Sequence, residues 1–337
     1  MSRKTVLPDP AVPVESFQKI SAERSSQKKL SKRDNHPSSP EVSSLFHSTS
    51  NRIASVLQEA TRLIGAVISE SPRLDAEVLL ADLLGRDRLW LHLYPDYTLS
   101  SSQLSRFQDR VKRRISQEPV AYIIGKTEFY SRKFICDRRA LIPRPDTELI
   151  VEKALEWAEQ HFIPGKPPMV LDLGTGSGIL AITLAMELRS DFLVAIDRSL
   201  TALELTAENL LMHGLNHCIH LICSDWFSSL RQEGLFHLIV SNPPYISPSH
   251  EKRLQPNVLN YEPHSALFDS SVTGTGHIEH IFSHAWKYLQ RPGLVLCEVG
   301  WDQWERVQDF VLSLGTYHSV ATHRDLSGHG RVVAAEF

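Results

Sequence analysis

The spacing of apolar positions changes along the chain. Over residues 51–117 they recur every three or four positions, as on one face of an amphipathic helix, for example in RIASVLQEATRLI (52–64). SPRLDAEVLLADLLG (71–85) repeats the pattern between a Ser-Pro start and a final Gly, which are typical of the two ends of a helix. The spacing therefore predicts a small helical bundle domain over 51–117.

The next segments have strand-like patterns. EPVAYIIGKTEFYSRKFICD (118–137) alternates and contains β-forming residues, so we assign 118–145 as a β-hairpin linker. From 146 to 337, apolar runs such as PMVLDL, FLVAID and FHLIVS alternate with helical segments, and such runs are typical of parallel strands covered on both faces. The alternation predicts a doubly wound α/β domain over 146–337, and THRDLSGHGRVVAAEF (322–337) predicts two strands at an antiparallel edge.

The first 50 residues have a different composition. They contain 12 serines and no periodic apolar pattern, so they cannot bury enough apolar surface to offset the entropy of ordering. We therefore expect residues 1–50 to form a disordered tail. A transit peptide is the alternative, and the five acidic residues of this segment count against it.

Composition and charge exclude several classes of protein. Beyond residue 50 the chain carries 28 Lys and Arg against 34 Asp and Glu, which disfavours general binding to nucleic acid. No apolar run reaches the ~18 residues of a membrane span, so we expect a cytoplasmic protein without membrane contact. The four cysteines form no CxxC pair, and we predict no disulfide framework and no metal site. The histidines at 277, 280 and 284 share a predicted helical face and could suggest a metal site, but they lack a fourth partner, so we interpret them as a satisfied or exposed cluster.

A glycine-rich turn is the first candidate for chemistry. VLDLGTGSG (170–178) follows a predicted strand and opens a predicted helix, and its glycines let the backbone turn tightly and approach a ligand. The spacing is G-x-G-x-G and differs from the dinucleotide fingerprint G-x-G-x-x-G. A tight turn without a ligand is the alternative for this motif alone. The candidate cofactor-binding residues here are Asp172, Gly174, Thr175, Gly176, Ser177 and Gly178.

Acidic residues end the neighbouring strands. Asp197 follows the glycines by about 20 residues, which is where an acid meets a ribose hydroxyl pair in nucleotide-binding α/β folds. Asp225 and Trp226 end the third strand and add a carboxylate and a flat ring. Asp172 can engage a cationic ligand. A pyrophosphate would favour free helix N–H groups without an acid alongside, so the pattern predicts a site for a nucleoside without phosphates.

The fourth strand ends in an unusual way. FHLIVS (236–241) runs into Asn242, Pro243, Pro244 and Tyr245, and two prolines end any strand. The Asn242 side chain can both donate and accept hydrogen bonds, and the Tyr245 ring offers a stacking face. Acceptors that hold the hydrogens of an amide favour its pyramidal, nucleophilic form, so this edge is a candidate clamp for an amino or amide nitrogen. A plain Pro-Pro exit from a strand is the alternative.

The glycine loop and the Asn-Pro-Pro-Tyr edge together resemble the S-adenosylmethionine-dependent methyltransferases that act on amino or amide nitrogens. The wider match is to the protein-(glutamine-N5) methyltransferases of peptide chain release factors, and it runs from about residue 51 to 337. The motifs that carry it, in chain order, are SPRLDAEVLLADLLG, EPVAYIIGKTEFY, LIPRPDTELIVE, DLGTGSGILAI, SNPPYI, YEPHSAL, CEVGWDQ and DLSGHGRVV.

This resemblance implies a class I, Rossmann-like methyltransferase with a mostly parallel seven-stranded sheet and S-adenosylmethionine as cofactor. It implies that 174–178, Asp197, Trp226 and Asn242 contact the cofactor. It also implies that 242–245 and Phe129 hold the glutamine of a release factor's Gly-Gly-Gln motif, and that the helical bundle helps to dock that protein. We expect a monomer. One departure from the family is FDSSVTGTG (268–276), where a Gly-rich, acidic turn is expected.

Two other functions are consistent with parts of the pattern. A nucleic-acid methyltransferase acting on adenine or cytosine amino groups can use the same clamp, but the net negative charge beyond residue 50 and the motifs of the linker favour a protein substrate. A non-catalytic cofactor-binding module is the second alternative, and the intact Asn-Pro-Pro-Tyr edge argues against it. Glu298, at the end of a predicted core strand, is interpreted as structural.

Overall fold

The computed structural model describes residues 50–68, 70–163 and 165–337. The tail predicted for residues 1–50 therefore lies outside the described residues, except for Ser50. Among the described residues, no helix is both long enough and apolar enough to span a membrane.

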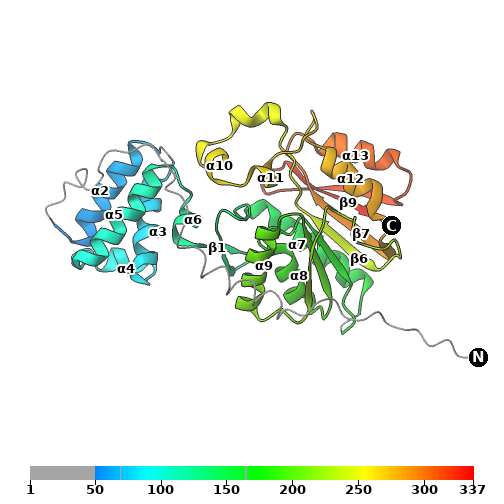
Figure 1. Ribbon diagram of the computed structural model, residues 1–337, viewed down its shortest axis with the longest axis horizontal. Helices are drawn as coiled ribbons and strands as arrows, with labels where there is room; N and C mark the ends of the chain where they lie inside the picture. Colours follow the sequence, from blue (N-terminus) through cyan, green and yellow to red (C-terminus); the bar gives the residue numbers. More distant parts are fainter. Residues whose placement is uncertain (1–49, 69, 164) are drawn as a thin grey trace, which may run out of the picture. The chain divides into compact units, whose positions relative to one another are not determined.

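Helices form the first described region, as the apolar spacing predicts. Its core gathers apolar side chains from all of these helices, and the predicted stripe of the first helix, from Ile53 to Ile64, is buried in it. Ser100 and Gln103 form a capping box that fixes the start of one helix. The helices are α2 (Ile53–Gly65), α3 (Pro72–Leu84), α4 (Arg88–Leu93), α5 (Ser101–Ile115) and α6 (Val120–Ile124) (Figure 1).

The segment expected to be a hairpin throughout begins with helix α6. Pro119 precedes this short helix and Gly125, with a φ of 75°, ends it. Tyr122 and Ile123 are buried, so the apolar residues read as alternating belong to a helical turn packed against its neighbours. The hairpin itself is shorter than predicted. It consists of β1 (Lys126–Phe129) and β2 (Arg132–Ile135), which pair antiparallel around a two-residue turn.

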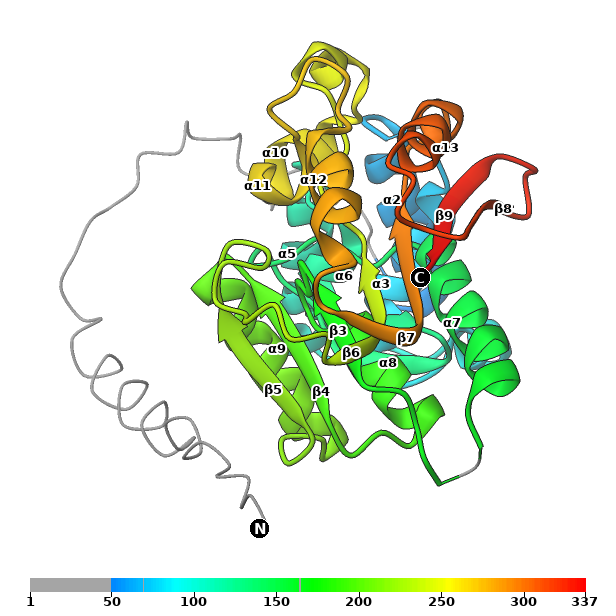
Figure 2. The same ribbon diagram turned by 90° about the vertical axis from the view of Figure 1, so that its right-hand side faces the viewer.

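Seven strands in the described part of the chain form one sheet, in the order β5-β4-β3-β6-β7-β9-β8. Neighbours from β5 to β7 pair parallel, whereas β9 pairs antiparallel with β7 and β8. This confirms the doubly wound, mostly parallel sheet and its antiparallel edge, and Figure 2 shows β5 and β8 at opposite edges. The strands are β3 (Val170–Leu173), β4 (Leu193–Asp197), β5 (Ile219–Cys223), β6 (Phe236–Ser241), β7 (Leu289–Glu298), β8 (Ser319–Arg324) and β9 (Gly330–Glu336).

Helices cover both faces of the sheet, and successive strand residues enter different cores. Val170 packs with α7 (Glu148–His161), α8 (Ile179–Leu188) and α9 (Leu200–His213), whereas its neighbour Leu171 packs with α12 (Gly276–Ala285) and α13 (Trp304–Ser313). Figure 1 shows the green and the orange helices on the two sides of the strands. Burial on both faces explains why the strands are apolar runs without alternation.

The connection from β6 to α12 is the longest in this part of the fold. It contains the short helices η3 (Pro248–Arg253), α10 (Pro256–Tyr261) and α11 (His264–Leu267). Another short helix, η2 (Pro145–Thr147), leads directly into α7. The chain order reverses at β3, because β4 lies on one side of it and β6 on the other. In such sheets the crevice at the carboxyl ends of the strands is the usual ligand site.

Gly178 lies where α9 packs against the start of α8. Its φ is +84°, and a Cβ at this position would lie 2.7 Å from Thr206 Cγ2. We expect Gly178→Ala to lower the free energy of unfolding by about 2–4 kcal/mol, from backbone strain and overpacking together. Thr206→Ser removes the obstructing methyl group and keeps the hydroxyl, whose Oγ1 donates to Gly176 O at 2.8 Å.

The cost of Gly178→Ala should therefore be smaller by at least about 1 kcal/mol in the Thr206→Ser background. Denaturant unfolding of the four proteins of this double-mutant cycle measures the difference. An equal cost in the two backgrounds would contradict a clash with the Thr206 methyl group.

Candidate active site

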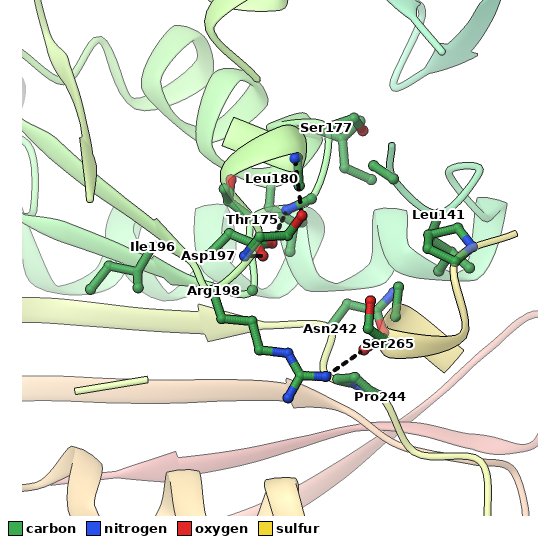
Figure 3. A pocket seen from close by; sticks show the side chains of 18 of the residues that line it. Leu141, Thr175, Ser177, Leu180, Ile196, Asp197, Arg198, Asn242, Pro244 and Ser265 are labelled. Atoms are coloured by element: carbon green, nitrogen blue, oxygen red, sulfur yellow. Dashed lines mark hydrogen bonds between the residues drawn. The ribbon is translucent and has the colours of Figure 1, made fainter. Parts of the chain in front are cut away.

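A cleft lies at the carboxyl ends of β3, β4 and β6, and it encloses about 980 Å³ with its open mouth included. Figure 3 shows its lining, with Thr175 and Asp197 on one side and Asn242 and Pro244 on the other. The lining comprises 139–141, Pro143, Arg144, Thr147, 174–177, Ile179, Leu180, 196–199, Ala202, 224–226, Asn242, Pro244, Pro263, Ser265, Ala266 and His277. Of the predicted site residues, these include Gly174 to Ser177, Asp197, Asp225, Trp226, Asn242 and Pro244.

The glycine loop is held by the neighbouring strand. The N–H groups of Gly174 and Thr175 donate to Ile196 O at 2.8 and 2.9 Å, and Gly176 N–H donates to Asp197 Oδ2 at 2.9 Å. Gly174 and Gly176 have φ values of 73° and 59°, which side chains rarely allow. Burial raises the pKa of Asp197, and backbone N–H groups oppose that shift. The loop and the carboxylate are thus fixed relative to each other.

Asp172 lies beneath the loop and is 0% exposed. Its Oδ2 accepts from Thr175 Oγ1 at 2.7 Å and from Ala181 N–H at 3.1 Å, whereas Oδ1 has no hydrogen-bond partner among the described residues. Burial raises the pKa of Asp172 to about 7. Asp172 therefore does not line the cleft, and its direct contact with a ligand stays a prediction. A cation in the cleft would nevertheless be attracted by this unpaired, poorly solvated carboxylate.

Trp226 forms a flat wall beside the glycine loop. A Cβ on Gly174 would lie 3.6 Å from its ring, so a larger residue at 174 would compete for the space against the indole. The Trp226 ring also lies beside the His277 ring of α12, with ring centroids 5.2 Å apart. Asp225 is exposed and also lines the cleft. The structure thus brings the predicted carboxylate and ring to the same crevice as the glycines.

The Asn-Pro-Pro-Tyr edge closes the opposite side. Ser241 Oγ anchors its start by donating to Leu173 O at 2.7 Å. The Asn242 amide nitrogen Nδ2 donates to Thr147 Oγ1 at 3.1 Å, and Asn242 Oδ1 has no partner within the described ranges. Pro243 is buried, whereas Pro244 lines the cleft. Asn242 and Pro244 therefore present this edge to the glycine loop.

Two predicted substrate residues lie away from the cleft lining. The Tyr245 ring packs against the sheet core, and its hydroxyl donates to Glu298 Oε1 at 3.2 Å. Phe129 is 1% exposed and packs edge-on against Phe134, with ring centroids 6.4 Å apart. A ring enclosed in this way cannot contact a ligand in the cleft without moving. The structure therefore places Phe129 and Tyr245 outside the cleft lining, and their contact with substrate stays a prediction.

The divergent segment FDSSVTGTG packs behind the same edge. Gly274 lies so close to Tyr245 O that no side chain fits at its position. Gln303 Nε2 donates to Tyr245 O at 2.8 Å and to Thr273 O at 3.0 Å, which ties the segment to the edge. Asp269 Oδ2 accepts from His277 N–H at 2.6 Å and so fixes the start of α12. The departure from the family pattern thus forms an ordered support of the Asn-Pro-Pro-Tyr edge.

Thr147 and His277 are two of the lining residues that sequence reasoning missed. Thr147 lies within LIPRPDTELIVE, a motif that carried the resemblance without a role for its threonine. His277 was interpreted as part of a satisfied or exposed histidine cluster, and the structure places it in the cleft lining beside Trp226. One signal could have indicated this position of His277: it lies at the start of helix α12, directly after the connection that begins at the end of β6. Thr147 gave none, because it contacts Asn242 from 95 residues away.

Comparisons with known proteins agree with this geometry. Residues 55–125 match a family model described as PrmC N-terminal domain, and residues 159–260 match one described as Methyltransferase small domain. With the order of the sheet and the glycine loop, the second match defines a class I, Rossmann-like methyltransferase fold.

Curated relatives then identify the family. The release factor glutamine methyltransferase of Shewanella oneidensis is 40% identical, covering 77% of this chain and 87% of that protein. The one of Escherichia coli (strain K12) is 37% identical, covering 78% and 91%. The chain belongs to the release factor glutamine methyltransferase family. A bifunctional methyltransferase of Rickettsia bellii is 33% identical, and this chain spans about half (50%) of its length.

The buried Asp172 predicts a particular pH dependence of stability. Its pKa of about 7 lies above the ~3.9 of an unfolded chain, so the folded state binds the proton more tightly. This contribution to stability is complete below pH ~4 and is lost as the pH rises through about 7. We expect the wild type to lose about 1 kcal/mol more than Asp172→Asn between pH 6 and pH 8.

Denaturant titrations of both proteins at the two pH values measure this difference. Glu298 is present in both, so its own titration cancels. Parallel losses in the two proteins would show that Asp172 is ionised throughout this range.

Proposed function

We propose that this protein transfers the methyl group of S-adenosylmethionine to the side-chain amide nitrogen of the glutamine in the Gly-Gly-Gln motif of peptide chain release factors. The observation that carries the proposal is that Asn242 lines the same cleft as the glycine loop, and that its Oδ1 has no hydrogen-bond partner among the residues the structure describes. The names of the curated relatives support this substrate.

The lining of the cleft fits S-adenosylmethionine. When bound, this cofactor supplies an electrophilic methyl group on a positively charged sulfur. Asp197 would hold the ribose hydroxyls, and Trp226 and Ile196 would enclose the adenine ring. Close approach of the ligand's amino-acid part is possible at Gly174 and Gly176, which have no side chains. The unpaired Asp172 Oδ1 favours a ligand that carries positive charge.

The remaining chemistry falls to the Asn-Pro-Pro-Tyr edge. A glutamine amide nitrogen is unreactive because its lone pair is delocalised into the carbonyl. Asn242 Oδ1 would accept one amide hydrogen, and a backbone carbonyl of this edge would accept the other. These acceptors would localise the lone pair as the new N–C bond forms and the bond from the methyl carbon to sulfur breaks, with its electron pair left on the sulfur. One amide proton would then be released to solvent. The transition state is therefore stabilised more than the planar ground state.

The helical region, residues 51–117, would dock the release factor. It exposes several large apolar side chains at α4 and just beyond it, which is unusual for a surface without a partner. They are Leu89 at 64%, Leu93 at 64%, Tyr94 at 53% and Tyr97 at 42% exposure. Because release factors act at the ribosome, we expect the reaction in the cytoplasm, and we expect the enzyme to act as a monomer.

Methyl transfer to a purified release factor tests the function directly. Mass spectrometry after incubation with S-adenosylmethionine should locate one added methyl group on the glutamine of the Gly-Gly-Gln motif. A release factor with that glutamine replaced by alanine should remain unmodified. Methylation of nucleic acid and not of the release factor would replace this proposal with the alternative of an adenine or cytosine amino methyltransferase.

Asp197→Ala should weaken the binding of S-adenosylmethionine by about 1–3 kcal/mol, because hydrogen bonds to a charged group are lost. Isothermal calorimetry measures the affinity. Asp191→Ala is the matched control, because Asp191 is exposed and precedes β4 at the opposite end of the strand. Unchanged affinity in Asp197→Ala would remove this carboxylate from the cofactor site.

Asn242→Ala should lower kcat about 10²–10³-fold, which is the usual cost of losing one preorganised polar partner. Affinity for the cofactor should change little, because the glycine loop, Asp197 and Trp226 remain. Single-turnover methylation and a cofactor titration separate the two effects. The same substitution at the exposed Asn216 should leave both unchanged. Normal binding with a near wild-type rate would show that Asn242 is not the clamp.

A further inference from the structure

A chain of hydrogen bonds runs from the cleft into the core. Asn242 Nδ2 donates to Thr147 Oγ1 at 3.1 Å, and Thr147 Oγ1 donates to Glu298 Oε2 at 2.7 Å. Tyr245 donates its hydroxyl to the other oxygen, Glu298 Oε1, at 3.2 Å. The four residues come from the end of β6, from η2 and from the end of β7. Thr147 is 0% exposed and Glu298 is 1% exposed, so the bond between them is shielded from water.

The direction of this chain follows from which groups can donate. An ionised carboxylate only accepts, so the single hydroxyl hydrogen of Thr147 points to Glu298. The Thr147 oxygen can then only accept from Asn242, which requires the NH₂ of the Asn242 amide to face Thr147. Its Oδ1 is consequently the atom left for the cleft. With the amide turned over, a donor would face the hydrogens of a substrate amide and no side-chain acceptor would be available.

We propose that Glu298 and Thr147 are positioning residues, which hold the Asn242 amide with its oxygen toward the substrate nitrogen. The inference rests on the proposed function for the identity of that substrate. It concerns side-chain orientation within this chain, however, and can be observed without turnover. Glu298 lies outside the cleft lining, and both residues would act through Asn242.

The charges around Glu298 make this orientation sensitive to pH. Burial raises the pKa of Glu298 to about 7, while Thr147, Arg331 and Tyr245 favour its charged form and Asp146 disfavours it. Arg331 of β9 shares its charge with Asp146 and Asp325, each at 3.1 Å, and so compensates Glu298 only in part. Once protonated, Glu298 can donate to Thr147. The Thr147 hydroxyl is then free to donate to Asn242, and the amide loses its fixed direction.

Variants at Thr147 separate positioning from folding. Thr147→Val keeps the shape and removes the hydroxyl, so single-turnover methylation of a purified release factor should slow about 10–100-fold because the Asn242 NH₂ loses its partner. Affinity for S-adenosylmethionine should stay near wild type, whereas the melting temperature should fall because the buried Glu298 carboxylate loses one hydrogen-bond donor. Thr147→Ser retains the hydroxyl and should restore most of the rate and of the stability. A purely structural role would lower the affinity together with the rate.

The pH profile tests Glu298. The wild-type rate should fall by up to about tenfold per pH unit below pH ~7, as the carboxylate is protonated. Glu298→Gln cannot titrate, so this fall should disappear and leave a lower rate that is flat with pH. An unchanged fall in Glu298→Gln would assign it to another group, such as Asp172, and overturn the pH part of the inference.

The NMR signals of the Asn242 side-chain NH₂ test orientation without any substrate. In ¹⁵N-labelled protein they should shift as the pH crosses ~7, and they should move in Thr147→Val. Signals that respond to neither change, together with a wild-type rate in Thr147→Val, would overturn the inference. If the wild type does not methylate the release factor, the proposed function fails. The NMR result still decides whether Glu298 and Thr147 orient Asn242.

Discussion

The pairing of β3 with β4 on one side and β6 on the other is the constraint on which the site depends. Parallel pairing brings the carboxyl ends of these strands to one edge, and the change of direction at β3 opens a crevice there. The loop after β3 is then fixed by Ile196 O and Asp197 of β4. Asn242 after β6 faces it from the other side. Residues far apart in sequence form one cleft because the parallel register of β3, β4 and β6 places the ends of these strands side by side.

Much of this arrangement could be predicted from local patterns. Continuous apolar runs indicate parallel strands covered on both faces, and β3 supplies both cores with alternate residues, as such a run requires. The glycines, Asp197 and Asn242 could be placed at one edge because each follows a predicted strand. The short helix α6 was missed because a run of five apolar residues fits both the helix and the strand period. Pro119 and Gly125 set the two ends of this helix through their backbone geometry, which the apolar pattern does not show.

Side-chain depth could not be predicted in the same way. Asp172 and Asp197 both end or nearly end a strand, yet one is enclosed beneath the loop and the other lines the cleft. Phe129 ends β1, but Phe134 and the sheet core enclose its ring. Glu298 appeared structural because it ends a buried strand. Its contacts to Thr147 and Tyr245 join segments 151 and 53 residues away, a separation that no local pattern encodes.

Two buried carboxylates have opposite relations to the cleft. Asp172 Oδ1 has no hydrogen-bond partner in the described part of the chain, so its negative charge would act on a ligand in the cleft. Both oxygens of Glu298 accept hydrogen bonds, so its charge acts on the direction of the bonds around it. Burial raises the pKa of each to about 7, because in both places the charged form has lost its water. The charge of Asp172 would therefore favour a cationic ligand in the cleft. The charge of Glu298 instead fixes the direction of the hydrogen bonds that the uncharged side chains of Thr147 and Tyr245 donate.

The prolines of the Asn-Pro-Pro-Tyr edge decide which hydrogen-bonding groups its backbone offers. Pro243 and Pro244 have no N–H, so the backbone of this edge offers fewer donors and keeps its carbonyl acceptors. With the NH₂ of Asn242 turned toward Thr147, the side chain also offers an oxygen. An edge composed largely of acceptors is complementary to a group with two hydrogens on one nitrogen. A hydroxyl could satisfy only one acceptor, and leaving the other unpaired in a desolvated cleft is costly. For the proposed function, such an edge would select a primary amide or amine before any reaction begins.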